Sequence, residues 1–145
     1  MYHTAPRRVE VRQEAVPSPG AGEVTVRSVI SAISAGTEML FYRGLVGEGT
    51  PLDETIASIR SRLQYPYKYG YATVGVVETT GEGVPLSWVG REVFCFHPHE
   101  SRFTLPLGEV RPVPAGMNVE DAVFFPAMET ALSLTMDAAP IVGEN

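Results

Sequence analysis

Apolar and polar residues alternate along several short segments of the chain, which is typical of strands with one buried face. The clearest example runs from Glu23 to Ala32, where Val24, Val26 and Ser28 share one face. Similar patterns predict further strands over Arg8–Glu14, Tyr71–Thr80, Glu92–His97 and Arg102–Leu105. A glycine inside the second of these, Gly75, indicates a bulge or a close approach of two backbones.

Helical patterns occupy the middle and the end of the chain. Thr50–Leu63 has a capping residue type, a proline at its first helical position and an apolar stripe, so we expect a helix there. A turn of small residues is expected to open a short helix from Thr37. Asn118 is a suitable cap for another helix. We expect Pro126 to interrupt that helix before a last one over Met128–Ala138.

The order of these elements predicts the fold class. Strands come first and helices last, without regular strand–helix alternation. The 14 glycines and 12 prolines suit short strands joined by turns. We therefore expect a mainly β (α+β) fold, a small β-barrel or sandwich with peripheral helices, over residues 1–138. Residues 139–145 are expected to begin a linker to a further domain.

Charge and composition exclude some classes of function. The net charge is −6, from 11 basic and 17 acidic residues, and no basic run exceeds Arg7-Arg8. A nucleic-acid-binding surface is therefore not expected. No apolar stretch approaches the ~20 residues that span a bilayer, and no secretory segment is evident. Cys95 is the single cysteine, so we expect a reducing, cytoplasmic setting.

Four motifs in order, followed by a closing segment, resemble a known domain. They are Glu23–Arg27, Ser31–Glu38, Tyr69–Val77, Val89–Val93, and then Val113–Gly116 with Val119–Ala122. Together they resemble the N-terminal GroES-like domain of medium-chain, zinc-type alcohol dehydrogenases. Further segments are similar to the bacteriochlorophyllide dehydrogenase branch of that family; they are Ile33–Glu38, Lys68–Tyr71, Phe94 with Pro98-His99, and Met128–Ala131.

The resemblance implies a substrate-binding domain whose nucleotide-binding partner, a Rossmann domain, is missing from this chain. The intact protein would then be an NAD- or NADP-dependent oxidoreductase acting on a small alcohol or carbonyl compound, with no cofactor expected on this chain alone. The alternative is a stand-alone binding or scaffold domain with the same fold and no enzymatic activity. A glycine-rich turn after a further strand would favour the first reading, because that motif binds dinucleotide phosphates.

The resemblance also implies where a catalytic zinc would bind. Zinc-dependent members use a cysteine, a His-Glu pair and a later cysteine or glutamate. By spacing, these positions fall on Ala35, on Tyr71 with Ala72, and near Pro126. Zinc prefers thiolate, imidazole or carboxylate ligands. The second, structural zinc of the family needs four cysteines, so we predict no zinc at either place.

A different metal site remains an alternative. Cys95, His97 and His99 lie two residues apart, so on an extended strand their side chains would share one face. Pro98 disturbs such a strand, and ligands this close are strained around one tetrahedral ion. We prefer the reading of a buried cysteine beside two histidines that line a substrate pocket.

Two residues are candidates for catalysis. Thr37 falls where the family keeps a hydroxyl for its proton relay, and it is equally suited to cap the following helix. Tyr71, at a metal-ligand position, could donate a proton to a carbonyl. It could instead be an aromatic plug in the volume that zinc vacates. Glu38 could orient Thr37, but a first-turn carboxylate that favours the helix dipole is the better reading.

Two residues near the end of the chain are candidates for cofactor binding. Thr130 matches a position at which family members contact the nicotinamide. Glu129 is an unusual charge in an apolar run, so it is either a residue of the cleft between the domains or a solvated helix residue. We also expect an exposed apolar patch over Met128–Met136, where the absent domain would pack.

Overall fold

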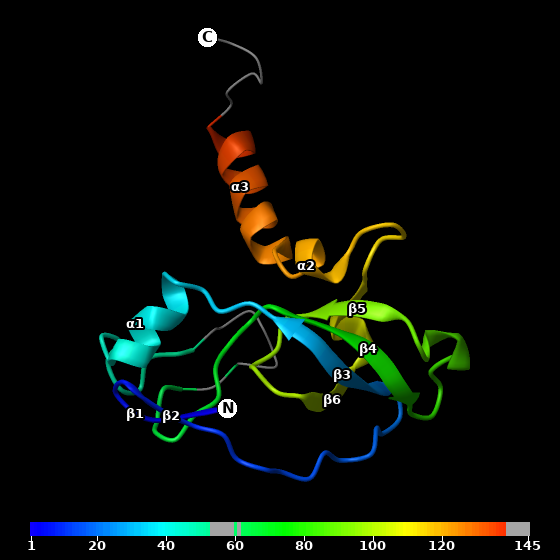
Figure 1. Cartoon of the computed structure of the whole chain (residues 1–145), viewed down its shortest axis with the longest axis horizontal. Helices are drawn as coiled ribbons and strands as arrows, with labels where there is room; N and C mark the ends of the chain where they lie inside the picture. The colour runs from blue at the N-terminus through cyan, green and yellow to red at the C-terminus, as the bar shows by residue number, and fades with distance from the viewer. Residues whose placement is uncertain (53–59, 61, 139–145) are drawn as a thin grey trace.

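Two antiparallel sheets carry the fold in the computed structural model, which describes residues 1–52, 60 and 62–138 (Figure 1). The larger sheet has the strand order β6-β3-β4-β5-β7, and β1 pairs only with β2. The strands are β1 (Tyr2–Ala5), β2 (Arg8–Glu10), β3 (Glu23–Ser31), β4 (Thr73–Thr80), β5 (Glu92–Cys95), β6 (Arg102–Pro106) and β7 (Val110–Pro112). This curled sheet with few helices confirms the prediction of a mainly β protein.

The strand predictions hold for β3, β4, β5 and β6 of the larger sheet, miss β7, and fail at the start of the chain. The strand expected over Arg8–Glu14 ends at Glu10, and the side chain of Val11 is 90% exposed. Alternation alone could not show that residues beyond Glu10 lack a pairing partner. Strand β1 was not predicted; it is defined by its hairpin pairing with β2 and by a long-range bridge from His3 to Tyr67.

Gly75 confirms the predicted close approach of two backbones. It pairs with Ser28 of β3, directly beside a register shift between Ser28 and Ile30. A Cβ atom on Gly75 would lie 2.5 Å from the carbonyl oxygen of Arg27 and 2.6 Å from a methyl carbon of Val26. Only glycine lets β3 and β4 meet at this distance.

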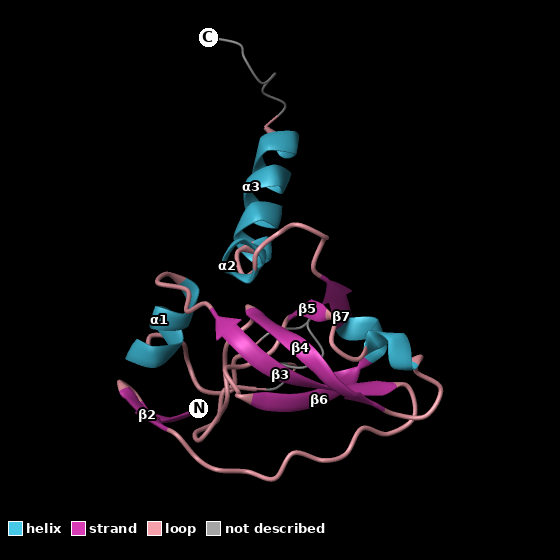
Figure 2. Cartoon of the chain, turned by 45° about the vertical axis from the view of Figure 1, so that its right-hand side comes forward, coloured by secondary structure: helices cyan, strands magenta, loops and turns pink. Residues whose placement is uncertain are grey.

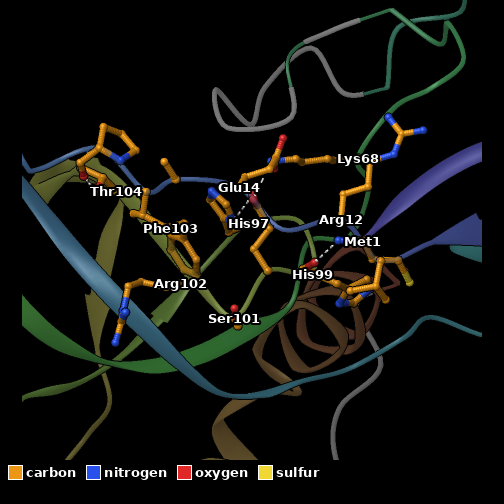
Figure 3. Close-up of a pocket in the computed structure, with 15 residues that line it drawn as sticks. Met1, Arg12, Glu14, Lys68, His97, His99, Ser101, Arg102, Phe103 and Thr104 are labelled. Carbon is orange, nitrogen blue, oxygen red and sulfur yellow. Dashed lines mark hydrogen bonds and ion pairs between the residues drawn. The ribbon is translucent and has the colours of Figure 1, made fainter.

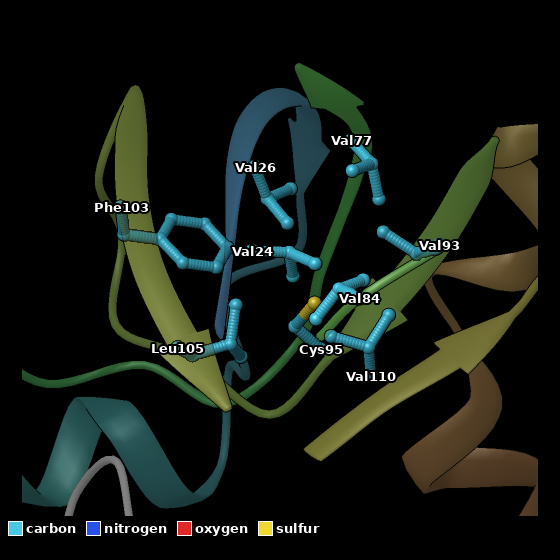
Figure 4. Close-up of a cluster of buried hydrophobic side chains, with 9 residues drawn as sticks. All are labelled: Val24, Val26, Val77, Val84, Val93, Cys95, Phe103, Leu105 and Val110. Carbon is cyan, nitrogen blue, oxygen red and sulfur yellow. The ribbon is translucent and has the colours of Figure 1, made fainter. Parts of the chain in front are cut away.

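The main core lies within the curl of the larger sheet (Figure 4). Its members are mostly β-branched residues on the inner faces of the strands, as expected for a half-buried sheet. The cluster contains Val24, Val26, Val77, Val84, Val93, Cys95, Phe103, Leu105 and Val110. Cys95 is fully buried here, and burial raises the pKa of its thiol to about 12.

Residues at the helix starts explain where two of the three helices begin. They are α1 (Thr37–Arg43), α2 (Val119–Ala122) and α3 (Phe125–Asp137), with short 3₁₀ turns η2 (Leu86–Trp88) and η3 (Leu107–Glu109). Asn118 caps α2 as predicted, because its side-chain oxygen accepts a hydrogen bond from the N–H of Asp121 at 2.7 Å. Pro126 does not interrupt a helix; it lies in the first turn of α3, where no N–H is needed.

Two expectations lie wholly or partly outside the described residues. The helix predicted over Thr50–Leu63 falls mainly on residues 53–59 and 61, and the expected linker is residues 139–145. At the ends of the first segment, Pro51 forms an antiparallel bridge with Arg62. The N–H of Leu63 donates to the carbonyl of Thr50 at 2.8 Å.

Helix α3 extends away from the sheet (Figures 1 and 2). None of its residues is buried, and its exposed apolar side chains include Met128, Leu132, Leu134 and Met136. The apolar patch expected over Met128–Met136 is therefore present. None of the helices in the described part of the chain is long and apolar enough to cross a membrane.

Candidate functional site

A pocket of about 520 Å³ lies where the end of β3, the start of β4 and α3 meet, and we call it the α3 pocket. It is lined by Ala32, Ile33, Ser34, Ala35, Tyr71, Ala72, Val123, Phe124, Pro126, Ala127, Thr130, Ala131 and Leu134. Its polar side chains are those of Ser34, Tyr71 and Thr130, and no charged side chain of the described residues lines it. The pocket therefore suits an uncharged, largely apolar ligand with one or two polar atoms.

The α3 pocket collects every position at which the sequence resemblance places a zinc ligand. Ala35, Tyr71, Ala72 and Pro126 all line it, although they come from three separate segments of the chain. Their side chains offer two methyl groups, a phenol and a pyrrolidine ring, which do not form a zinc ligand set. Among the described residues, no group of three or more His, Cys, Asp or Glu side chains could hold a metal ion.

Tyr71 contributes the central polar group of this pocket. It lies two residues before β4 and is half-buried, with its ring edge-on to Tyr69 at a centroid distance of 6.4 Å. Its hydroxyl makes no hydrogen bond with any residue in the described part of the chain. The hydroxyl can therefore donate to, or accept from, a bound ligand without breaking an internal bond.

Thr130 and Glu129 are neighbours in sequence but line different cavities. Thr130 lines the α3 pocket, and its hydroxyl donates to the carbonyl of Pro126 at 2.9 Å, which leaves its oxygen free to accept. Glu129 is exposed on α3 and lines a separate cavity of about 400 Å³ with Phe94 and Arg111. The structure thus brings Thr130, and not Glu129, together with Tyr71.

Thr37 lies outside the residues that line the α3 pocket. It is exposed, and it is the first residue of α1, while Gly36 occupies the N-cap position. The cap that was expected from Thr37 is supplied differently: the N–H of Thr37 donates to Oγ of Ser34 at 3.1 Å. The role of Thr37 in a proton relay stays a prediction.

His97 and His99 lie in a second, polar pocket of about 500 Å³ (Figure 3). Lys68 dominates this polar pocket, with ion pairs to Glu14 at 2.5 Å and Glu100 at 2.6 Å. Burial disfavours the charged form of Lys68, but the hydrogen bonds to Glu100 and Glu14 outweigh it and raise the pKa of the ammonium group. The ammonium charge of Lys68 is therefore already neutralised by two carboxylates and is not available to bind an anion.

His97 is packed as a structural residue. It is buried, its ring is stacked on Phe103 at a centroid distance of 3.7 Å, and its Nδ1 donates to the carbonyl of Pro98 at 3.1 Å. Burial lowers the pKa of His97. Cys95 packs in the main core while His97 lies in the polar pocket, so the two side chains do not form one metal site with His99.

Glu38 and His99 form a hydrogen-bonded pair that the sequence did not predict. Oε2 of Glu38 lies 2.7 Å from Nε2 of His99, and the two side chains are only 4% and 9% exposed. Oε1 of Glu38 accepts the N–H of Ser34 at 2.9 Å, and Nδ1 of His99 lies 2.9 Å from Oγ of Ser31. Glu38 is in the first turn of α1 as expected, but it is a buried hydrogen-bonding centre.

Comparison with known proteins identifies the fold. No protein-family model and no curated protein matches the chain. Among solved structures, a short chain alcohol dehydrogenase of E. coli CFT073, complexed with NADH, superimposes with a TM-score of 0.72 and 19% identity over 96% of this chain and 45% of that one. A quinone oxidoreductase of Thermus thermophilus, also solved with NADPH, gives 0.63 and 22% over 95% and 40%.

An NAD-dependent alcohol dehydrogenase gives a TM-score of 0.69 and 21% identity, over 94% of this chain and 46% of that chain. At such identities the likeness shows a shared fold. The chain spans less than half the length of each of these proteins. The chain is therefore a mainly β domain with a fold that, in its structural neighbours, forms part of a larger oxidoreductase.

Proposed function

We propose that this chain is the substrate-binding part of a zinc-independent, NAD(P)-dependent oxidoreductase of the medium-chain dehydrogenase/reductase superfamily. Its fold would be the GroES-like barrel of that superfamily. The α3 pocket would hold the reacting end of a small alcohol or carbonyl compound. Fold similarity alone does not define a function, so the proposal depends on this pocket.

One observation carries the proposal. Three separate segments, residues 32–35, 71–72 and 123–134, converge on a single pocket. These segments contain the positions that the resemblance assigns to the catalytic metal and to nicotinamide contact. Convergence in space of Ala35, Tyr71 and Thr130 is not a consequence of their order in the sequence. It is expected if the pocket is the counterpart of a dehydrogenase active site.

The residues of the pocket would bind and orient the substrate. The hydroxyl of Tyr71 has no competing partner among the described residues, so it can donate a hydrogen bond to a carbonyl oxygen or accept one from an alcohol. Thr130 would contact the cofactor through its free acceptor oxygen. The apolar wall excludes water around the reacting atoms. A nicotinamide, when bound, supplies or accepts the hydride.

The apolar patch on α3 is the surface on which a nucleotide-binding domain would pack. Leu132, Leu134 and Met136 are 62%, 65% and 71% exposed in this chain. Apolar side chains gathered along one helix commonly mark an interface. A further domain here would also close the open side of the α3 pocket. The cofactor would then bind between the two domains, next to Thr130.

The test is cofactor-dependent turnover by the full-length protein, followed as the change in nicotinamide absorbance with panels of alcohols, ketones and quinones. Activity should persist after exhaustive treatment with a zinc chelator, and metal analysis should find substoichiometric zinc. The 145-residue chain alone should bind neither dinucleotide tightly. Turnover that is lost on chelation and restored by zinc would contradict the zinc-independent assignment. Micromolar dinucleotide binding by this chain would contradict the proposal that a separate domain binds the cofactor.

A further inference from the structure

His99 contacts two of the three segments that form the α3 pocket, those that carry Ser34 and Tyr71, although it does not line that pocket. Its Nε2 bonds to Glu38, which in turn holds the N–H of Ser34, a pocket residue. Its Nδ1 bonds to Ser31, which lies one residue before the pocket wall. The ring also lies beside Gly70, which directly precedes Tyr71.

The contact with Gly70 is close enough to couple the two positions. Gly70 has φ +131°, and a Cβ built on it would lie 2.8 Å from both Cδ2 and Nε2 of His99. The imidazole therefore fills the space beside the Gly70 backbone where any other residue would place its side chain. The N–H of His99 also donates to the carbonyl of Tyr69, at 3.5 Å. His99 therefore adjoins residues 69–71 through both its ring and its backbone N–H.

The Glu38–His99 pair is suited to fix this arrangement rigidly. Both side chains are almost fully removed from water, and a charge-assisted hydrogen bond is stronger in such surroundings than at the surface. Both carboxylate oxygens of Glu38 are used, one by the N–H of Ser34 and the other by the imidazole of His99. The ring orientation is fixed at two points, Glu38 and Ser31, so it has little freedom to rotate.

We propose that Glu38 and His99 are positioning residues that set the place of the Tyr71 hydroxyl relative to the 32–35 wall of the α3 pocket. Neither touches the ligand. The catalytic consequence rests on the function proposed above, but the positioning itself does not. The pair acts from behind the pocket, through Ser34 on one side and Gly70 on the other.

The test follows Tyr71 directly in the full-length protein. Replacing the tyrosines with 3-fluorotyrosine allows ¹⁹F NMR, and Tyr71→Phe identifies the Tyr71 signal by its loss. His99→Phe keeps an aromatic ring, of larger size, and removes both hydrogen bonds, and Glu38→Ala removes the carboxylate without adding bulk. Glu38→Gln is the conservative variant. Lys68→Met is the matched control, because it removes an ion pair to Glu100 on the same loop as His99.

We expect the Tyr71 signal to move in His99→Phe and Glu38→Ala and to stay in place in Glu38→Gln and Lys68→Met. If either of the first two variants fails to fold, Ser31→Ala decides the question, because Ser31 is exposed and its loss removes only one of the two bonds to the ring. An unchanged Tyr71 signal in the folded variants overturns the proposal. So does an equal displacement in Lys68→Met, or a displacement in Glu38→Gln as large as that in Glu38→Ala.

Activity provides a second readout. If the enzyme assignment is correct, His99→Phe should lower kcat on the order of a hundredfold with a smaller effect on KM, since a misplaced catalytic group costs about that much. A displaced Tyr71 signal in a protein without oxidoreductase activity would refute the proposed function and leave the positioning role intact. An active enzyme whose Tyr71 signal does not move in these variants would refute the positioning role and leave the proposed function intact.

Discussion

The imidazole of His3 lies flat on the phenol ring of Tyr67, with ring centroids 4.9 Å apart and planes 8° from parallel. His3 is buried, and neither ring nitrogen has a hydrogen-bond partner among the described residues. Burial, as the largest cause, lowers the pKa of His3 below its ordinary value of 6.5. The unfolded chain therefore takes up a proton at a pH where the folded chain does not.

This relationship predicts a specific acid sensitivity. The contribution of neutral His3 to stability is fully present above the unfolded pKa and is lost as pH falls through 6.5 towards the folded pKa. His3→Phe should therefore make the unfolding free energy depend less on pH between about pH 7.5 and about pH 5. Urea unfolding at several pH values measures this, and equal slopes for the two proteins would contradict it.

The pH range in which His3 affects stability is separate from the range in which the paired carboxylates do. Hydrogen bonds and nearby positive charges lower the pKa of Glu14, through Lys68, and of Glu78, through Arg102. Stability that depends on these groups is lost only as pH falls below their ordinary value of 4.5. His97, whose pKa burial also lowers, has the same sign as His3, so some slope should remain in His3→Phe.

Tyr71→Phe should separate the two readings of this residue. The variant keeps the ring that lines the α3 pocket and removes the hydroxyl, which has no partner in the described part of the chain. Thermal stability should be unchanged. Turnover of the full-length protein should fall about 10²-fold or more if the hydroxyl donates a proton. Tyr42→Phe, in α1 and outside the pocket, is the control. Full activity in Tyr71→Phe would leave only the space-filling role.

Gly75→Ala should destabilise the protein by about 1–3 kcal/mol, the usual cost of overpacking. The new methyl group would meet the carbonyl of Arg27 at 2.5 Å, and neither backbone can move without breaking the β3–β4 ladder. Gly108→Ala is the matched control, since a Cβ there meets no atom within 4 Å. Chemical denaturation of both variants measures the difference. Similar stabilities would show that the strands can separate at low cost.

The thiol of Cys95 should be inert in the folded protein. It is fully buried among the valines of the main core, and burial raises its pKa to about 12. Thiolate is the reactive form, so a thiol reagent at about pH 8 should modify Cys95 only on the unfolding timescale. Labelling with and without denaturant, followed by mass spectrometry, tests this. Rapid labelling of the native protein would mean that the core opens readily.

Substitutions on α3 should affect assembly rather than folding of this chain. Leu132 and Met136 lie one turn apart and are 62% and 71% exposed. Changing both to Gln should leave the unfolding free energy of the isolated chain within about 0.5 kcal/mol of wild type. In the full-length protein the same change should lower the melting temperature, because the proposed domain interface loses apolar contact. No effect in the full-length protein would place the interface elsewhere.

Predictions from sequence succeeded where the signal was local. The strand predicted over Glu23–Ala32, the cap at Asn118 and the close approach at Gly75 were each signalled by a short stretch of sequence, and the structure has all three, with the strand ending at Ser31. The failures are equally physical. Pro126 was expected to end a helix and instead lies in the first turn of one, because proline is excluded from helix interiors but accepted at their start.

The candidate site could be anticipated only in part. Tyr71 and Thr130 were both expected to serve one reaction, and they do line one pocket. Glu129, one residue away, lines a different cavity, because successive residues of a helix point about 100° apart. His99, expected to line a substrate pocket, lies in the polar pocket, and its pairing with Glu38 was not predicted. No local pattern marks that pair, which joins residues 61 positions apart.

The sequence by itself determined four strands of the larger sheet, β3 to β6, the need for glycine at position 75 and the absence of zinc-binding side chains at Ala35 and Pro126. These follow from residue chemistry and short-range geometry. Only the tertiary structure decided which side chains meet: Tyr71 with Thr130 across the α3 pocket, and Glu38 with His99 behind it. Contacts of that kind depend on how strands and helices pack in space, and the periodicity of residues along the chain does not specify that packing.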